Sequence, residues 1–265
     1  MRYAIISDVH ANLEALRAVM AAISNEGADE IHCLGDVVGY YADPNACVEL
    51  LAVGGVHTIA GNHDRVATGE DEPEDFGETA RRAILWTREH LDAESRRFLT
   101  GLPIVHEIGD DFVMVHGAFH PAPDVALHLG SRSRVRRSID ALAFGSYAAR
   151  LGLFGHTHRP VIHELRGGRL RTLGAGSCTL DPGAHYLINP GSVGQPRDGD
   201  PRASFLVLDT ETRRVVHRRI GYDQGACDRK ARSAGLLHRE TLLHRVVHRA
   251  KVALETCADA ISRRT

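Results

Sequence analysis

Five short apolar segments of this chain each lead directly into Asp, Asn or His residues that stand beside a glycine or a one-residue spacer. The first segment covers residues 3–6 and is followed by Asp8 and, after one spacer, His10. Residues two apart in a strand point to the same side, so this pair can converge on one point at the strand end. A carboxylate oxygen beside an imidazole nitrogen suits a divalent metal such as manganese, iron or zinc.

The segments between the first strand ends have helical periodicity. Apolar residues recur at helical spacing over residues 12–26, and further apolar strands are expected at 31–34 and 56–60. A second helix is expected to begin at Asp43 and Pro44, because Asp is a good cap and Pro is tolerated in the first turn. This alternation predicts an α/β fold with a parallel sheet and helical crossovers, whose functional groups gather at the carboxyl ends of the strands.

The second half of the chain predicts a different sheet. Residues 65–75 are acidic and read as an irregular loop. Further helices are expected near 76–91, 93–100 and 134–143, and further strands at 112–115 and 151–154. After these, a more antiparallel second sheet is expected from strands at 161–165, 169–173, 186–188, 204–208 and 214–220, with a hairpin turn at Gly167-Gly168. Helical periodicity then returns, which predicts a domain over 1–221 and a helical C-terminal extension over 222–265.

Composition excludes several classes of protein. The 265 residues are 43% hydrophobic and carry a net charge of −2, so bulk electrostatics give no reason to expect binding to nucleic acid or to an anionic membrane. No apolar run approaches the ~20 residues that a membrane helix needs. The first residues enter a strand without the basic segment and cleavage site of a secretory signal. Because the five cysteines are scattered, we expect reduced thiols and a cytoplasmic location.

Residues of the kinds that bind metals follow five of the expected strands, in order along the chain. They are Asp8 and His10, Asp36, Asn62 and His63, His116, and His156 and His158. Each motif alone is compatible with an ordinary turn, because Gly-Asp and His-Gly are common in turns and Asn tolerates left-handed backbone. Together the five motifs have the composition of a centre that holds two metal ions.

The order of these motifs resembles that of the calcineurin-like metallophosphoesterases. The blocks read Asp-x-His, Gly-Asp, Gly-Asn-His-Asp, His-Gly and Gly-His-Thr-His within residues 8–158. The sequences GDVVGY at 35–40 and NPGSVGQPR at 189–197 resemble the small prokaryotic, phosphodiesterase-type branch of that family. The resemblance implies a four-layer α-β-β-α sandwich in which two mixed sheets pack face to face. The helical tail lies outside the resemblance.

The resemblance also implies a role for each motif residue. The first ion would be held by Asp8, His10 and His158, the second by Asn62, His116 and His156, and both would be bridged by Asp36. A hydroxide between the two cations would attack phosphorus directly. His63 would protonate the leaving oxygen or steady the phosphate charge, with its ring oriented by Asp64 or by a backbone carbonyl. The ligand types admit Mn, Fe, Ni, Co, Zn or Mg, and we expect manganese first.

Two residues outside these roles have open interpretations. Arg197 lies on a loop rich in Pro and Gly, where it either contacts a substrate phosphate or is an exposed loop charge. Tyr40 either faces the substrate cleft or packs beneath it.

The main functional hypothesis is a two-metal phosphohydrolase that cleaves a phosphodiester in a small molecule or a nucleotide. A phosphomonoesterase acting on a phosphoprotein or a dinucleotide is the alternative activity. A non-catalytic metal-binding scaffold on the same fold is the alternative from another class. It is disfavoured because such proteins usually lose a ligand or the acid, whereas this chain retains His63 and every ligand type. The apolar positions of the tail favour packing on the domain or, as a homo-oligomer, on a second copy.

Overall fold

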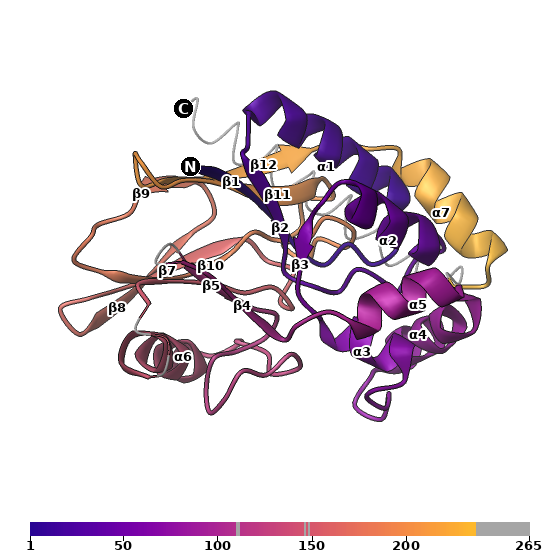
Figure 1. Ribbon diagram of the computed structural model, residues 1–265, viewed down its shortest axis with the longest axis horizontal. Coiled ribbons are helices and arrows are strands. Elements are labelled where there is room, and N and C mark those ends of the chain that lie inside the picture. The colour runs from indigo at the N-terminus through magenta and orange to yellow at the C-terminus, as the bar shows by residue number, and fades with distance from the viewer. Residues whose placement is uncertain (110–111, 146, 148, 237–265) are drawn as a thin grey trace, which may run out of the picture.

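Two six-stranded sheets form the centre of the fold in the computed structural model, which describes residues 1–109, 112–145, 147 and 149–236 (Figure 1). The first sheet has the order β3 (His57–Thr58), β2 (Glu30–Cys33), β1 (Arg2–Ile6), β11 (Ala203–Asp209), β12 (Arg214–Ile220) and β9 (Ser177–Thr179). The second sheet has the order β4 (Val105–Ile108), β5 (Phe112–Val115), β6 (Leu151–Leu153), β10 (His185–Asn189), β7 (Val161–Arg166) and β8 (Arg169–Gly174). Both sheets are mixed: β1 pairs in parallel with β2 and antiparallel with β11, whereas β10 pairs in parallel with β6 and antiparallel with β7.

Helices cover the outer faces of the two sheets. The described helices are α1 (Leu13–Glu26), α2 (Pro44–Val53), α3 (Asn62–Thr68), α4 (Glu78–His90), α5 (Ala93–Thr100), α6 (Arg132–Phe144) and α7 (Gln224–Ser233). Helices α1 and α2 pack on the first sheet, α6 packs on the second, and α7 lies beside α1 (Figure 1). The four-layer α-β-β-α arrangement confirms the predicted fold class.

Alternation of side chains along each strand explains the layers. In β1, Tyr3 and Ile5 belong to the core between the two sheets, whereas Ala4 and Ile6 face the helices. In β5, Phe112 and Met114 lie in the same inter-sheet core, and the intervening valines face α6. Strands that are buried on both faces read as continuous apolar runs, which is why these segments stood out in the sequence.

The predicted sheet membership of two strands is wrong. The sequence pattern assigns 204–208 and 214–220 to the second sheet, but β11 and β12 belong to the first, where β11 pairs with β1. The strands of the Gly167-Gly168 hairpin, β7 and β8, do lie in the second sheet as expected. Alternating apolar residues reveal that a strand is buried but not which strand lies beside it, so this choice rests on tertiary structure.

Local structure differs from the prediction at three places. Helix α3 occupies part of the stretch predicted to be irregular, and β4 and β9 are additional strands. Helix α2 begins at Pro44 as predicted, but Asp43 makes no side-chain capping hydrogen bond. Its carboxylate instead accepts a hydrogen bond from Lys230 on α7 at 2.8 Å, and the same ammonium lies 2.6 Å from Glu14. Asp43 therefore joins α7 to the domain.

The predicted extension is described only in part. Helix α7 packs against α1, and Cys227, Ala231 and Leu236 lie in a small core with Tyr41 and Ala83. Residues 237–265, on which the predicted contacts with a second copy depend, lie outside the described residues. The division at residue 222 stays a prediction. Among the described helices, none has both the length and the apolar character needed to cross a membrane.

Truncation of Leu206 tests the burial of β11 between the sheets. Leu206 is fully buried in the core between the sheets, so Leu206→Ala should lower the free energy of unfolding by about 2–5 kcal/mol. Leu85 is 37% exposed, and Leu85→Ala should cost less than about 1 kcal/mol. Urea unfolding followed by circular dichroism measures both, and equal losses would contradict the burial of Leu206.

Candidate metal centre

Ligand-type side chains from several strand-end loops meet in one buried space. Asp8 and His10 follow β1, Asp36 follows β2, His116 follows β5, and His156 and His158 follow β6. Their ligand atoms form two groups, each with all atoms within 4.8 Å of one another: Asp8, His10, Asp36 and His158, and Asp36, His116 and His156. Asp36 belongs to both groups, which is the arrangement required of a bridging carboxylate.

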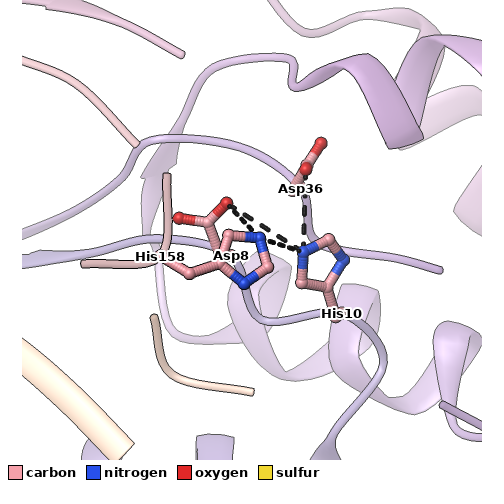
Figure 2. Close-up of side chains that lie close together, drawn as sticks. All are labelled: Asp8, His10, Asp36 and His158. Carbon is pink, nitrogen blue, oxygen red and sulfur yellow. Dashed lines mark hydrogen bonds and ion pairs between the residues drawn. The ribbon is translucent and has the colours of Figure 1, made fainter. Parts of the chain in front are cut away.

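In the first group, two imidazole nitrogens lie close together (Figure 2). His10 Nε2 lies 3.1 Å from His158 Nε2 and 3.7 Å from Asp36 Oδ2, while His158 Nε2 lies 3.3 Å from Asp8 Oδ1. The other nitrogen of each ring lies against a backbone carbonyl: His10 Nδ1 is 3.1 Å from Val38 O, and His158 Nδ1 is 2.6 Å from Gln195 O. Donation from Nδ1 leaves a lone pair on each Nε2, and a cation between them would remove their repulsion.

Buried polar atoms without partners lie in and around both groups. His116 Nδ1 donates to Leu34 O at 2.6 Å, and its Nε2 lies 3.2 Å from Asp36 Oδ2 without the alignment of a hydrogen bond. Asn62 Oδ1 and Asp8 Oδ2 are likewise buried and unpartnered. An unsatisfied buried polar atom costs about 1–3 kcal/mol. Oxygen and nitrogen atoms of this kind fit divalent cations, so the residues present fit the metal ions that the sequence predicts.

Burial and mutual proximity shift the pKa values of these groups in opposite directions. Burial, aided by the Asp36 carboxylate, raises the pKa of Asp8 to about 6. Burial opposes ionisation of Asp36 too, but His116, His63 and His10 hold its pKa well below its ordinary value. Burial also opposes protonation of His116, yet the two carboxylates raise its pKa to about 9. The space is therefore electrostatically suited to positive charge.

The backbone at the ligands adopts a conformation that non-glycine residues seldom use. Asp8, His10, Asp36, His156 and His158 all have φ between 53° and 60°, in the left-handed region, which costs about 1–2 kcal/mol per residue. Backbone hydrogen bonds between the loops hold this geometry, including Asp8 N–H to Gly35 O at 3.0 Å and His10 N–H to Asp36 O at 2.9 Å. Such conformations cluster where function requires a particular side-chain direction.

The 189–197 stretch supports the loops that carry the ligands. Asn189 Nδ2 donates to Gly155 O at 2.6 Å, directly before His156. Ser192 Oγ donates to Asp8 O at 2.8 Å, and Gly194 N–H donates to the same oxygen at 3.0 Å. This part of the chain therefore fixes ligands from both sheets, which explains why Asn and Ser stand there.

Asp64 does not orient the His63 ring, so that part of the prediction is wrong. Asp64 Oδ1 accepts from Val37 N–H at 2.8 Å, and Oδ2 accepts from Gly61 N–H at 2.9 Å. Burial and the neighbouring Asp36 raise the pKa of Asp64 to about 7, and hydrogen bonds from the Gly61 and Val38 amides oppose the rise. Because it is occupied with backbone amides, Asp64 joins the loop after β2 to the start of α3.

Packing holds the His63 ring instead of a hydrogen bond. Its centroid lies 4.7 Å from that of His10, 4.9 Å from that of Tyr40 and 4.6 Å from that of Phe76. Its Nδ1 is buried without a partner, and a Cβ on Gly39 would collide with that atom. Burial lowers the pKa of His63 to about 4. Sequence reasoning missed Phe76, because no pattern in the acidic stretch marks it.

Tyr40 and Arg197 line the same cavity as the ligands. The cavity has a volume of about 220 Å³, and its lining includes Asp36, Asn62, His63, His156, His158, Tyr40 and Arg197. Arg197 Nη2 donates to the Tyr40 hydroxyl at 3.1 Å and to Gln195 Oε1 at 2.9 Å. Tyr40 is half-buried and Arg197 is exposed. Tyr40 therefore faces the cleft, which is the first of its two interpretations. Contact of Arg197 with a substrate phosphate stays a prediction.

A family model, the calcineurin-like phosphoesterase superfamily domain, matches residues 1–213. The chain belongs to this superfamily. The predicted family is thus confirmed, and the protein is a metal-dependent phosphoester hydrolase.

Individual relatives of this phosphoesterase agree with the family model. A metallophosphoesterase from Sphaerobacter thermophilus is 36% identical, with a TM-score of 0.74 over 94% of this chain and 99% of that chain. An uncharacterized protein of Methanocaldococcus jannaschii is 38% identical over 222 residues, which are 83% of this chain and 87% of that protein. A hypothetical protein of Pyrococcus horikoshii shares the fold, with 19% identity and a TM-score of 0.72 over 91% of this chain and 96% of that chain.

Manganese should stabilise the metal-free phosphoesterase through Asp36. At 100 times its dissociation constant, an ion that binds the folded state adds about 2.7 kcal/mol, which corresponds to roughly 5–10 °C in melting temperature. Asp36→Asn should lose most of that increase, because the carboxylate common to both groups is removed. Differential scanning fluorimetry with and without Mn²⁺ measures it. Asp140→Asn, which removes a carboxylate paired with Arg136 on α6, should keep the full increase; an equal increase in Asp36→Asn would contradict the site.

Gly39→Ala should displace the His63 ring while metal binding persists. Gly39 has a φ of +93°, and its missing Cβ leaves room for His63 Nδ1. We expect kcat on p-nitrophenyl phosphoesters to fall at least tenfold, with manganese content by mass spectrometry unchanged. Gly27→Ala is the matched control, since Gly27 has a φ of +64° with nothing within 4 Å of a Cβ, and it should retain kcat. An unchanged kcat in Gly39→Ala would show that the ring is not held there.

Proposed function

We propose that this phosphoesterase binds two divalent ions and hydrolyses phosphodiesters. Manganese is the metal that we expect first. The observation that carries the proposal is the position of Asp36 in both ligand groups, next to a cavity that His63 also lines. Asp8, His10 and His158 would hold one ion, and His116 and His156 the other. Asn62 would join the second ion, because its buried Oδ1 has no other partner.

Two ions would supply Lewis-acid activation of water and neutralisation of charge on the phosphate. The chain's own residues bind and orient the substrate. Arg197 is the one Lys or Arg among the described residues that line the cavity, whose lining also includes Asp75. A phosphodiester carries one negative charge, whereas a phosphomonoester carries nearly two at neutral pH. A single arginine therefore supports the diester as the preferred substrate.

His63 would act on the leaving oxygen. Its Nδ1 faces Gly39, so the cavity side of the ring presents Nε2. The ring is neutral when the cavity holds no anion, because burial lowers its pKa. Negative charge on a bound phosphodiester and on the departing oxygen favours the protonated ring. His63 would then donate a hydrogen bond, or its proton, to that oxygen.

We also propose a cytoplasmic location and small-molecule or nucleotide phosphoesters as partners. The cytoplasmic location is supported by Cys33, Cys47 and Cys178, which are reduced thiols in the described part of the chain. Contact with a second copy through the C-terminal extension remains a proposal from the apolar pattern of the sequence.

A panel of esters tests the activity. After chelation and addition of Mn²⁺, the protein should hydrolyse bis(p-nitrophenyl) phosphate with a kcat/KM at least tenfold above that for p-nitrophenyl phosphate. Preference for the monoester would favour the phosphomonoesterase alternative, to be tested further on phosphopeptides and dinucleotides. Tight manganese binding without turnover of any ester would favour the non-catalytic scaffold.

The variant His63→Ala tests whether His63 acts as an acid or as a metal ligand. It should lower kcat on a diester whose leaving group is an alcohol by about 10²–10⁴-fold, the usual contribution of a positioned acid, with manganese content unchanged. Loss of the metal in this variant would show that His63 holds an ion. The effect should be smaller for esters whose leaving group is a stronger acid, because such groups need less protonation.

A further inference from the structure

The lining of the substrate cavity is of two chemical kinds. One part consists of the metal-type ligands Asp36, Asn62, His156 and His158. The remainder includes the rings of Tyr40 and Phe76 and the small residues Gly77, Ala80 and Ala126. The volume of about 220 Å³ is below the roughly 300–1,000 Å³ of sites for drug-sized ligands. The ligands and His63 account for the phosphate. The two aromatic rings confine His63 and, because they also line the cavity, offer a surface to the rest of the substrate.

The two rings flank the residue assigned to the leaving oxygen. The centroid of His63 lies 4.9 Å from that of Tyr40, with the planes at 35°, and 4.6 Å from that of Phe76, with the planes at 42°. An organic group bound to an oxygen beside His63 has to lie next to these rings. Small neighbours leave room for such a group, because Gly77, Ala80 and Ala126 carry little or no side chain.

Both rings are fixed independently of any substrate. Tyr40 is held by the hydrogen bond from Arg197 at 3.1 Å. Phe76 packs against the core cluster beneath the helices that cover the first sheet, and its N–H donates to Pro73 O at 3.1 Å. A binding surface that is ordered beforehand loses little conformational entropy when the ligand binds.

We propose that the leaving group of the natural substrate carries a planar aromatic ring and that Tyr40 and Phe76 bind this ring. The proposal rests on the proposed function, since it takes His63 as the neighbour of the leaving oxygen. Aromatic rings favour offset or edge-on contacts at centroid distances of 4.5–7 Å, and any planar ring with a π face can use them. An aryl ester and a nucleotide ester share this chemistry.

Binding of substrate fragments, in which the ring is still joined to the phosphorus group, tests the ring site without hydrolysis of a diester. Isothermal titration calorimetry on the manganese-loaded protein compares phenylphosphonate with methylphosphonate, and adenosine 5′-monophosphate with ribose 5-phosphate. The aromatic member of at least one pair should bind about tenfold tighter, which is the size of one ring contact. A preference in the first pair indicates an aryl ester, and one in the second indicates a nucleotide. Equal affinities within both pairs, or no binding of any of the four, would overturn the proposal.

Variants assign the preference to the two rings. Phe76→Leu keeps an apolar side chain against the core and should reduce the preference to about twofold. Tyr40 packs against a different cluster, and Tyr40→Leu should also reduce the preference to about twofold. This second variant keeps the proposal testable if Phe76→Leu does not fold. Phe98→Leu is the matched control, because Phe98 contacts the same core cluster as Phe76 but does not line the cavity. A preference that survives in both test variants would overturn the proposal.

These outcomes are distinct from failure of the proposed function. A protein that prefers the aromatic ligands yet hydrolyses no diester would retain the ring site and lose the diesterase assignment. A diesterase with no such preference would retain the activity and lose the ring site.

Discussion

Two carboxylates and several imidazoles lie close together in one buried space. The rest of the structure depends on how the free-energy cost of burying them together is compensated. Unpaired polar atoms and like lone pairs in the interior are costly, and they are retained only where a partner compensates for them. Asp8, Asp36, His10 and His158 offer that space to a cation, whose charge would satisfy all of them at once. The left-handed backbone at each of these residues is a further cost that the surrounding loops have to offset.

The loops offset the cost of the left-handed backbone, because their hydrogen bonds connect the two sheets at the site. His116 follows a strand of the second sheet but donates to Leu34 at the end of a strand of the first. Ser192 and Asn189 likewise bind the loops after β1 and β6. In His10, His116 and His158 a backbone carbonyl holds Nδ1 and directs Nε2 inward, so the direction of these three rings depends on neighbouring loops. Packing of the two sheets and geometry of the centre are therefore one property of the molecule.

Around His63 the structure uses a different principle. Its ring has no hydrogen-bonding partner at Nδ1 and is confined by Gly39, Tyr40 and Phe76. A ring held by packing keeps a fixed direction without being committed to one protonation state. The same rings that confine it also line the cavity, so in the proposed reaction one set of side chains would position the acid and select the leaving group.

The sequence by itself determined which residues meet in the candidate centre, because each motif directly follows an apolar strand and its residue types are those that metals prefer. It also determined local elements such as α1, α2 and the β7–β8 hairpin, whose signals lie within a few neighbouring residues. Tertiary structure alone decided that β11 lies beside β1, that Asp43 binds Lys230 instead of capping α2, and that Asp64 holds backbone amides instead of the His63 ring. The physical reason is distance along the chain. Periodicity and capping signals depend on neighbouring residues, whereas contacts between residues far apart in the chain depend on packing of the whole fold.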